Sequence, residues 1–136
     1  MNDQKKDWPA LLTLALIRTL AKLPFETGLK VGALLGNLIR LIAVKRRKVT
    51  QVNIRLCFPE LSCDEQQQLV KDIFIANGIG LVETAWAHYA DRSMFDNRVE
   101  IIGQHLLQNA LKEERGVMLL GAHFSTLDLG GLLFSY

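Results

Sequence analysis

The chain has 136 residues, which is enough for one ordinary domain and requires neither a second domain nor a partner. Its net charge of +2 is unevenly distributed, because residues 1–55 carry eleven Lys or Arg and three acidic residues (net +8), whereas residues 56–136 carry five and eleven (net −6). A basic first segment favours contact with an anionic surface, and the Leu-rich composition favours a membrane over nucleic acid. Two cysteines, Cys57 and Cys63, are too few for a disulfide framework and have no zinc-finger partners.

The first predicted helix covers residues 8–23 and ends at Pro24, because proline cannot continue a helix. At 1.5 Å per residue it would be roughly 24 Å long, shorter than the ~30 Å hydrocarbon core of a bilayer. It also contains Arg18. We therefore expect a tilted or partly inserted anchor with Trp8 at the interface, and no cleavable signal peptide.

A second helix is predicted to begin near Thr27, with one apolar stripe that continues to Leu56 before Phe58 and Pro59 end the element. Glycines recur at every fourth position of this helix. That spacing either arises by chance or brings another helix backbone close, most simply the first helix folded back as a hairpin. The apolar stripe begins with Val31, Leu34, Leu35, Leu38, Ile39 and Ile42, and the glycines are Gly28, Gly32 and Gly36.

Four adjacent cations, Lys45, Arg46, Arg47 and Lys48, lie beside this apolar stripe. They predict contact with phosphates of anionic membrane lipids, each contributing ~1 kcal/mol, with a solvated basic face as the alternative. A nucleic-acid interface is disfavoured, because the basic run has no interleaved aromatic residues and no recognisable reading helix.

Ser62 and Glu65 have the spacing of a capping box, which predicts a long helix ending near residues 89–91. Beyond it, residues 99–102 and 117–120 are predicted strands separated by a helix over 104–112. This order predicts a largely parallel sheet of the α/β class, with ligands bound beyond the carboxyl ends of its strands. Two regions are expected: membrane-associated helices over residues 1–57, and the start of a catalytic βαβα unit over residues 58–136.

His123 follows the second predicted strand, and Asp128 lies five residues later in the first turn of the next helix. A carboxylate that accepts from one imidazole nitrogen leaves the other nitrogen free to take a proton from an attacking hydroxyl. The alternative is that Ser125 or Thr126 caps the helix, with Ser125 and Asp128 resembling a capping box, and one carboxylate has enough acceptor positions for both interpretations to hold. Ser125 itself is a weaker nucleophile candidate because it lacks the G-x-S-x-G elbow, and His88 and His105 have no partner pattern.

These residues resemble the lysophospholipid acyltransferase-like enzymes, and within them the bacterial lipid A biosynthesis acyltransferases, the lauroyl and myristoyl transferases. The resemblance rests on three blocks in the family's order and spacing, over about residues 8–136. The first block is Arg46, Arg47, Lys48, Asn53, Leu56, Cys57, Phe58, Pro59 and Glu60; the second is Gly80, Leu81, Glu83 and Thr84; the third is Gly116, Val117, Leu119, Leu120, Gly121, His123, Phe124, Thr126, Leu127, Asp128 and Gly130.

The resemblance implies transfer of a fatty acyl chain from an acyl carrier protein thioester to a hydroxyl of a lipid A precursor. His123 would be the general base and Asp128 its orienting carboxylate, although many relatives have Glu at that position. No metal or other cofactor is implied, and the expected location is the cytoplasmic face of the bacterial inner membrane. Alternatives are an acceptor among glycerophospholipids or other glycolipids, or an inactive membrane-bound fragment.

The apolar run over residues 127–134 stops at Tyr136 without a cap, a glycine or a proline beyond it. Members of the resembled family continue well past this point, with an arginine-bearing block and most of the acyl-chain pocket. The sequence therefore predicts the N-terminal part of a longer protein, with an incomplete acyltransferase fold.

Overall fold

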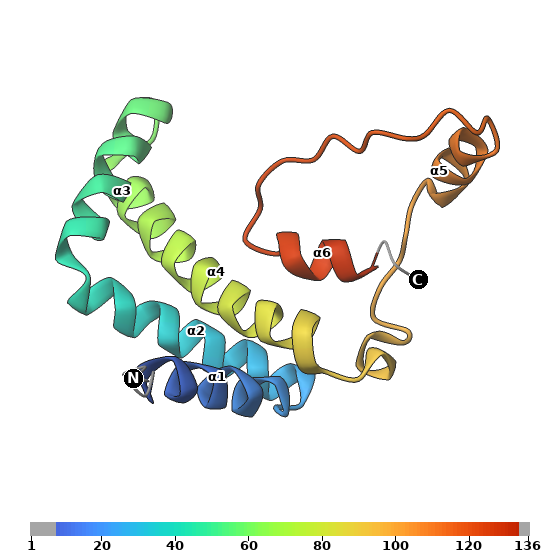
Figure 1. Cartoon of the computed structure of the whole chain (residues 1–136). Helices are drawn as coiled ribbons and strands as arrows, with labels where there is room; N and C mark the ends of the chain where they lie inside the picture. Colours follow the sequence, from blue (N-terminus) through green and yellow to red (C-terminus); the bar gives the residue numbers. More distant parts are fainter. Residues whose placement is uncertain (1–7, 134–136) are drawn as a thin grey trace, which may run out of the picture. The chain divides into compact units, whose positions relative to one another are not determined.

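The computed structural model describes residues 8–133, whose regular structure is helical (Figure 1). Of the described residues, 8–90 and 125–133 form one compact unit and 91–124 form a second, and each unit is considered by itself. The helices are α1 (Trp8–Ala21), α2 (Phe25–Ile42), α3 (Val44–Cys57), α4 (Cys63–Tyr89), α5 (Gln104–Leu111) and α6 (Leu127–Leu133), with a 3₁₀ turn over Arg92–Phe95.

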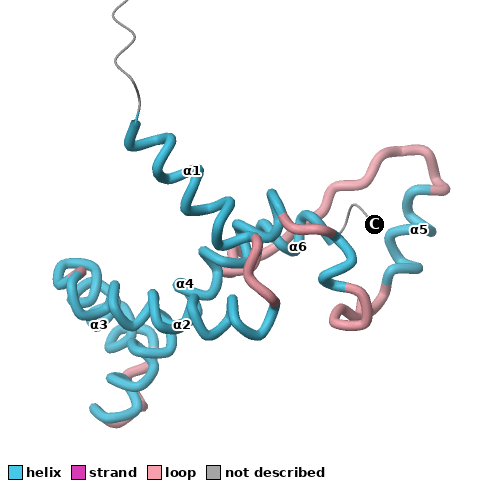
Figure 2. Tube along the Cα trace, turned by 90° about the horizontal axis from the view of Figure 1, so that it is seen from below, coloured by secondary structure: helices cyan, strands magenta, loops and turns pink. Residues whose placement is uncertain are grey.

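The predicted sheet is wrong, because none of the residues from 8 to 133 is in a strand, and the trace is helix and loop alone (Figure 2). Residues 99–102 and 117–120, expected as strands, lie in turns and extended loops. The apolar side chains of these segments are exposed to solvent: Ile102 is 88% exposed and Leu120 is fully exposed. Parallel strands are stable when neighbouring strands take their backbone hydrogen bonds and both faces are covered, and an apolar run alone supplies neither.

The longest helix, α4, begins where the capping box predicted it. The Oγ of Ser62 accepts from the backbone N–H of Glu65 over 3.4 Å, and the Glu65 carboxylate accepts from the Ser62 N–H over 2.8 Å. The two residues thus satisfy two backbone amides that the first turn leaves without partners. The helix then runs for 27 residues to Tyr89, as the sequence predicts.

Close packing of α2 on α4 organises the first unit, and it depends on glycine. A Cβ placed on Gly32 would lie 2.7 Å from the Ile79 Cα and 2.9 Å from the Gly78 carbonyl oxygen, and one on Gly36 would collide with the Phe74 carbonyl. The glycine spacing therefore does mark a close helix approach. The expected partner was wrong: the glycines contact α4 and not a folded-back α1.

Two apolar clusters fill the unit. Near the start of α2, the ring of Phe25 stacks on the fully buried Trp86, with centroids 5.3 Å apart, and Val82 is fully buried next to them. At the other end of α4, Ile54 of α3 is buried against Val70 and Phe74. Both α2 and α3 therefore pack apolar side chains against α4.

The element expected from Thr27 to Leu56 is not one helix. It bends by 96° at Ala43, which separates α2 from α3. The bend turns α3 so that Ile54 is buried against the apolar side of α4. If α3 continued straight from α2, Ile54 would lose this burial and its stabilising effect. Across the bend, Nη1 of Arg47 donates to the Arg40 carbonyl oxygen over 3.2 Å.

Much of the apolar surface of α1 and α2 has no cover in this structure. Trp8, Leu11 and Leu12 of α1 are each about 60% exposed, as are several of the stripe residues expected to be buried, including Leu34 (69%) and Ile42 (70%). Among the described residues, no single helix has the length and apolarity to cross a bilayer. Together α2 and α3 pass that test, but with the bend between them, and α1 is a shorter apolar helix.

Candidate active site

The carboxylate of Asp128 lies in the first turn of α6, where the sequence predicts it. Its Oδ2 accepts a hydrogen bond from the Thr84 hydroxyl of α4 over 2.9 Å. This hydrogen bond joins the first turn of α6 to α4. A carboxylate has two oxygens with several acceptor positions, so Oδ1 is left for another donor.

Gly80 explains how the start of α6 comes so close to α4. A Cβ at this position would lie 2.7 Å from the Ser125 carbonyl oxygen and 3.2 Å from the Ser125 Cβ. Any side chain would therefore push the segment before α6 away from the helix. Gly80 and Thr84 are one turn apart on the same face of α4, so the glycine allows the approach and the threonine anchors it.

Glu83 is a second carboxyl group on this part of α4. It is half-buried, and its Oε2 is shielded from solvent without a hydrogen-bond partner in the described residues. Burial raises the pKa of the Glu83 carboxyl above its ordinary value of 4.5, because the charged form loses hydration. Helix packing alone does not explain a carboxylate oxygen that is shielded from solvent and unpaired among the described residues.

His123 lies in the loop that ends the second unit, with an exposed side chain. Asp128 belongs to the first unit, so the pairing of the two side chains stays a prediction. His88 and His105 are also exposed, and His88 packs its ring against Tyr89 with centroids 6.3 Å apart. Among residues 8–133, no three His, Cys, Asp or Glu side chains are grouped so that they could hold a metal ion.

Sequence reasoning from spacing missed the role of Thr84, which entered only through the family resemblance. One signal was available in the pattern of α4. A glycine and a threonine stand four residues apart in a segment whose other positions are mostly apolar, and this places a small and a polar residue on one helical face. Such a face fits a closely packed, hydrogen-bonded neighbour, which is α6.

Comparisons with known proteins agree on one family. The sequence profile described as "Bacterial lipid A biosynthesis acyltransferase" matches residues 3–136. The lipid A biosynthesis lauroyltransferase of Escherichia coli (strain K12) is 32% identical over 127 residues, which are 93% of this chain and 42% of that protein. The palmitoleoyltransferase of the same strain is 30% identical over 124 residues, which are 91% of this chain and 40% of that protein.

A lipid A biosynthesis acyltransferase of Haemophilus influenzae is 28% identical over 127 residues, 92% of this chain and 40% of its own length. The chain thus spans about two fifths of the length of these curated relatives. No solved structure gives a significant match.

Proposed function

Because the chain belongs to the bacterial lipid A biosynthesis acyltransferase family, we propose that the protein transfers a fatty acyl chain from an acyl carrier protein thioester to a hydroxyl of a lipid A precursor. The relatives' names specify lauroyl and palmitoleoyl transfer for those proteins. The observation that supports the proposal within this chain is the hydrogen bond from Thr84 to the carboxylate of Asp128. Asp128 and His123 both belong to the third sequence block that resembles the family.

In the proposed reaction, His123 is the general base. One ring nitrogen takes the proton of the acceptor hydroxyl as its oxygen attacks the thioester carbonyl carbon. The C–S bond then breaks as the C–O ester bond is completed, and the proton passes from the imidazolium to the leaving thiolate. General base catalysis of this kind contributes ~10² to 10⁴-fold, so positioning and oxyanion stabilisation must supply the rest.

Asp128 has the role of orienting the imidazole. Its Oδ2 is occupied by the Thr84 hydroxyl, so Oδ1 is the oxygen we assign to the N–H of His123. Because one oxygen is already held by α4, the Asp128 side chain loses less conformational entropy when it binds the imidazole of His123. Thr84 is therefore a positioning residue, acting on the histidine through Asp128.

The test uses the gene product in a strain that lacks the corresponding acyltransferase, with lipid A analysed by mass spectrometry. His123→Ala is expected to abolish the added acyl mass while membrane association stays unchanged. Thr84→Val, which keeps the shape but removes the hydroxyl, is expected to lower kcat by about tenfold with little change in KM, since a hydrogen bond to a charged group is worth about 1.5–3 kcal/mol and this one is partly exposed.

Thr84→Ser is the matched control, because it retains the donor and should keep most of the activity. Equal losses in Thr84→Val and Thr84→Ser would mean that the methyl packing matters and the hydroxyl does not. Unaltered lipid A acylation with His123→Ala would refute the general base.

We place the protein at the cytoplasmic face of the inner membrane. Exposed Trp8, Leu11 and Leu12 on α1, together with the +8 net charge of residues 1–55, support an amphipathic helix lying in the headgroup region. Fractionation tests this location: recovery of the protein in the soluble fraction at low salt would argue against it.

A glycerophospholipid or another glycolipid is the alternative acceptor, since the same base chemistry serves any acceptor hydroxyl. Incubating membranes with a labelled acyl thioester shows which lipid gains the label. Label in lipid A precursor supports the proposal, and label confined to glycerophospholipid supports the alternative.

A further inference from the structure

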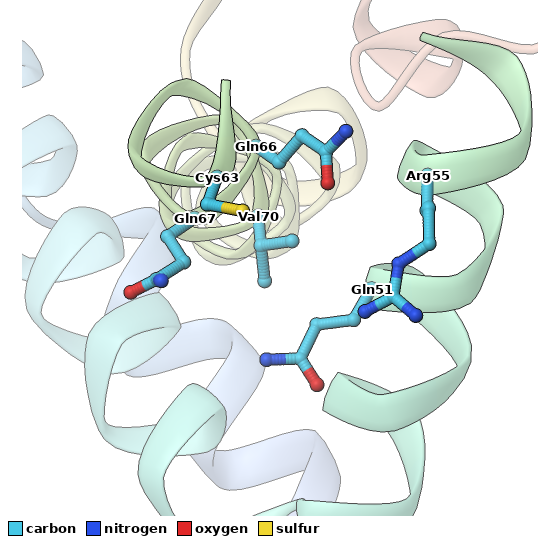
Figure 3. Close-up of a pocket in the computed structure, with 6 residues that line it drawn as sticks. All are labelled: Gln51, Arg55, Cys63, Gln66, Gln67 and Val70. Atoms are coloured by element: carbon cyan, nitrogen blue, oxygen red, sulfur yellow. The ribbon is translucent and has the colours of Figure 1, made fainter. Parts of the chain in front are cut away.

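A polar groove separates α3 from α4, at the end of the first unit away from Asp128. It consists of two adjoining hollows of about 190 and 380 Å³ that share Gln51, Gln67 and Val70 as lining residues. Figure 3 shows the side chains of Gln51 and Arg55 reaching into the smaller hollow from α3, with Val70 on the α4 side. We call these two hollows the α3–α4 groove.

Three cations from three different helices line the larger hollow: Arg40 of α2, Arg47 of α3 and Lys71 of α4. All three side chains are half-buried. None of them forms an ion pair with a carboxylate anywhere in residues 8–133. Positive charges that face one hollow repel each other, and partial burial weakens the screening by water, so the arrangement is stabilised when an anion enters.

The donors of the hollow are largely unused by the protein. The Nε of Arg40 is shielded from solvent and has no hydrogen-bond partner in the described residues. Arg47 uses Nη1 for the Arg40 carbonyl, which leaves its other donors available. Gln68, which also lines the hollow, donates to the carboxylate of Asp72 over 2.8 Å, and Asp72 itself does not line the hollow.

The arrangement fits a phosphate better than a carboxylate. Donors approach from three helices, and a tetrahedral phosphate presents oxygens in several directions, whereas a carboxylate presents two oxygens in one plane. Arginine forks and lysine ammonium groups are the side chains that proteins use for phosphate, and the neighbouring glutamines add neutral amide donors. The hollow far exceeds the ~15 Å³ that one water requires, so a phosphate group has room.

From this placement we propose that the α3–α4 groove binds a phosphate group, with Arg40, Arg47 and Lys71 as its ligands. Exposed Leu41 (58%) and Ile42 (70%) lie in the chain between the two arginines, next to the bend. Apolar side chains beside cations are typical of segments that meet lipid headgroups, so the phosphate of a lipid headgroup is one source and free phosphate the other.

This site is separate from the candidate active site. Lys71 and Thr84 are thirteen residues apart on α4, which is about 20 Å along the helix axis. Binding at the groove can therefore be measured without acyl donor or acceptor, and its outcome is independent of the His123–Asp128 hypothesis.

The experiment compares two double variants of the gene product that remove the same charge. Arg47→Gln with Lys71→Gln removes two ligands of the groove. Lys112→Gln with Arg115→Gln removes two exposed cations of the second unit, which do not line the groove. Inorganic phosphate and pyrophosphate binding is measured by calorimetry, and flotation is measured with phosphatidylcholine vesicles with and without phosphatidic acid. Circular dichroism establishes that both variants keep the wild-type helicity.

The groove variant is expected to bind at least about tenfold more weakly than the control variant, because each charge-assisted hydrogen bond to phosphate is roughly twice as strong as a neutral one. A selective loss with the soluble anions alone identifies free phosphate as the ligand, and a selective loss on phosphatidic acid vesicles identifies a lipid headgroup. Equal losses in the two variants would overturn the proposal, and so would wild-type protein that binds neither the anions nor the anionic vesicles in preference to phosphatidylcholine.

Discussion

Replacing Gly32 with alanine tests whether close backbone packing of α2 on α4 holds the first unit together. The added Cβ would lie 2.7 Å from the Ile79 Cα and 2.9 Å from the Gly78 carbonyl oxygen. Ordinary carbon contacts are about 3.5–4.0 Å, so the helices must separate by about 1 Å. The neighbours are backbone atoms, so no rotamer change can relieve the collision.

The expected cost follows from two opposing effects. Overpacking a close interface typically costs about 1–3 kcal/mol, and the upper part of that range applies because the obstruction is backbone. Alanine in place of glycine within a helix returns about 1 kcal/mol. The net destabilisation of Gly32→Ala is therefore about 1–2 kcal/mol, which should lower the Tm by several degrees.

Thermal and urea unfolding followed by circular dichroism measure this effect. Gly131→Ala is the matched control, since it lies in α6 and a Cβ there has no neighbour within 4 Å. The control should gain up to about 1 kcal/mol from helix propensity alone. A Gly32→Ala protein that melts at or above the wild-type temperature would refute the close-packing argument.

Two further predictions concern α4. Burial raises the pKa of Glu83, so its ionisation opposes folding: the penalty is absent below the ordinary value of 4.5 and grows as the pH rises through the folded-state pKa. Glu83→Gln should therefore raise the Tm at pH 7 and leave it unchanged at pH 4, and an equal shift at both values would contradict the burial argument. Hydrogen bonds from Ser62 lower the pKa of Glu65, so that contribution has the opposite sign, present above pH 4.5 and lost as the pH falls through the folded-state pKa. Ser62→Ala should cost about 1 kcal/mol at pH 7, by loss of the helix cap, and less in acid, as urea titrations at the two pH values would reveal.

Local signals in the sequence predicted where several of the helices begin or end. Pro24 separates the first two helices, and the Ser62–Glu65 pair marks the start of α4 because capping satisfies backbone amides within four residues. Asp128 in the first turn of the last helix is likewise a local feature. Each of these depends on neighbours in the chain, so a single sequence contains the information.

Features that depend on distant residues were harder to predict. The run Val117–Leu120 has the composition of a buried strand, but the partners that would pair with it and cover it are not specified by the run itself. The Gly28, Gly32 and Gly36 spacing indicated a close approach but could not identify which helix would approach. The bend at Ala43 is similar: apolar periodicity continues past it, and only the burial of Ile54 against α4 explains the change of direction.

The bend at Ala43 makes the angle between α2 and α3 dependent on few contacts. Ala43 alone joins two helices that meet nearly at a right angle, and the Arg47 guanidinium is tied to the Arg40 carbonyl on the opposite arm. A phosphate group bound by Arg40, Arg47 and Lys71 would contact α2, α3 and α4 together. Occupancy of the groove would then restrain the angle between α2 and α3, so that this angle depends on whether the groove is filled.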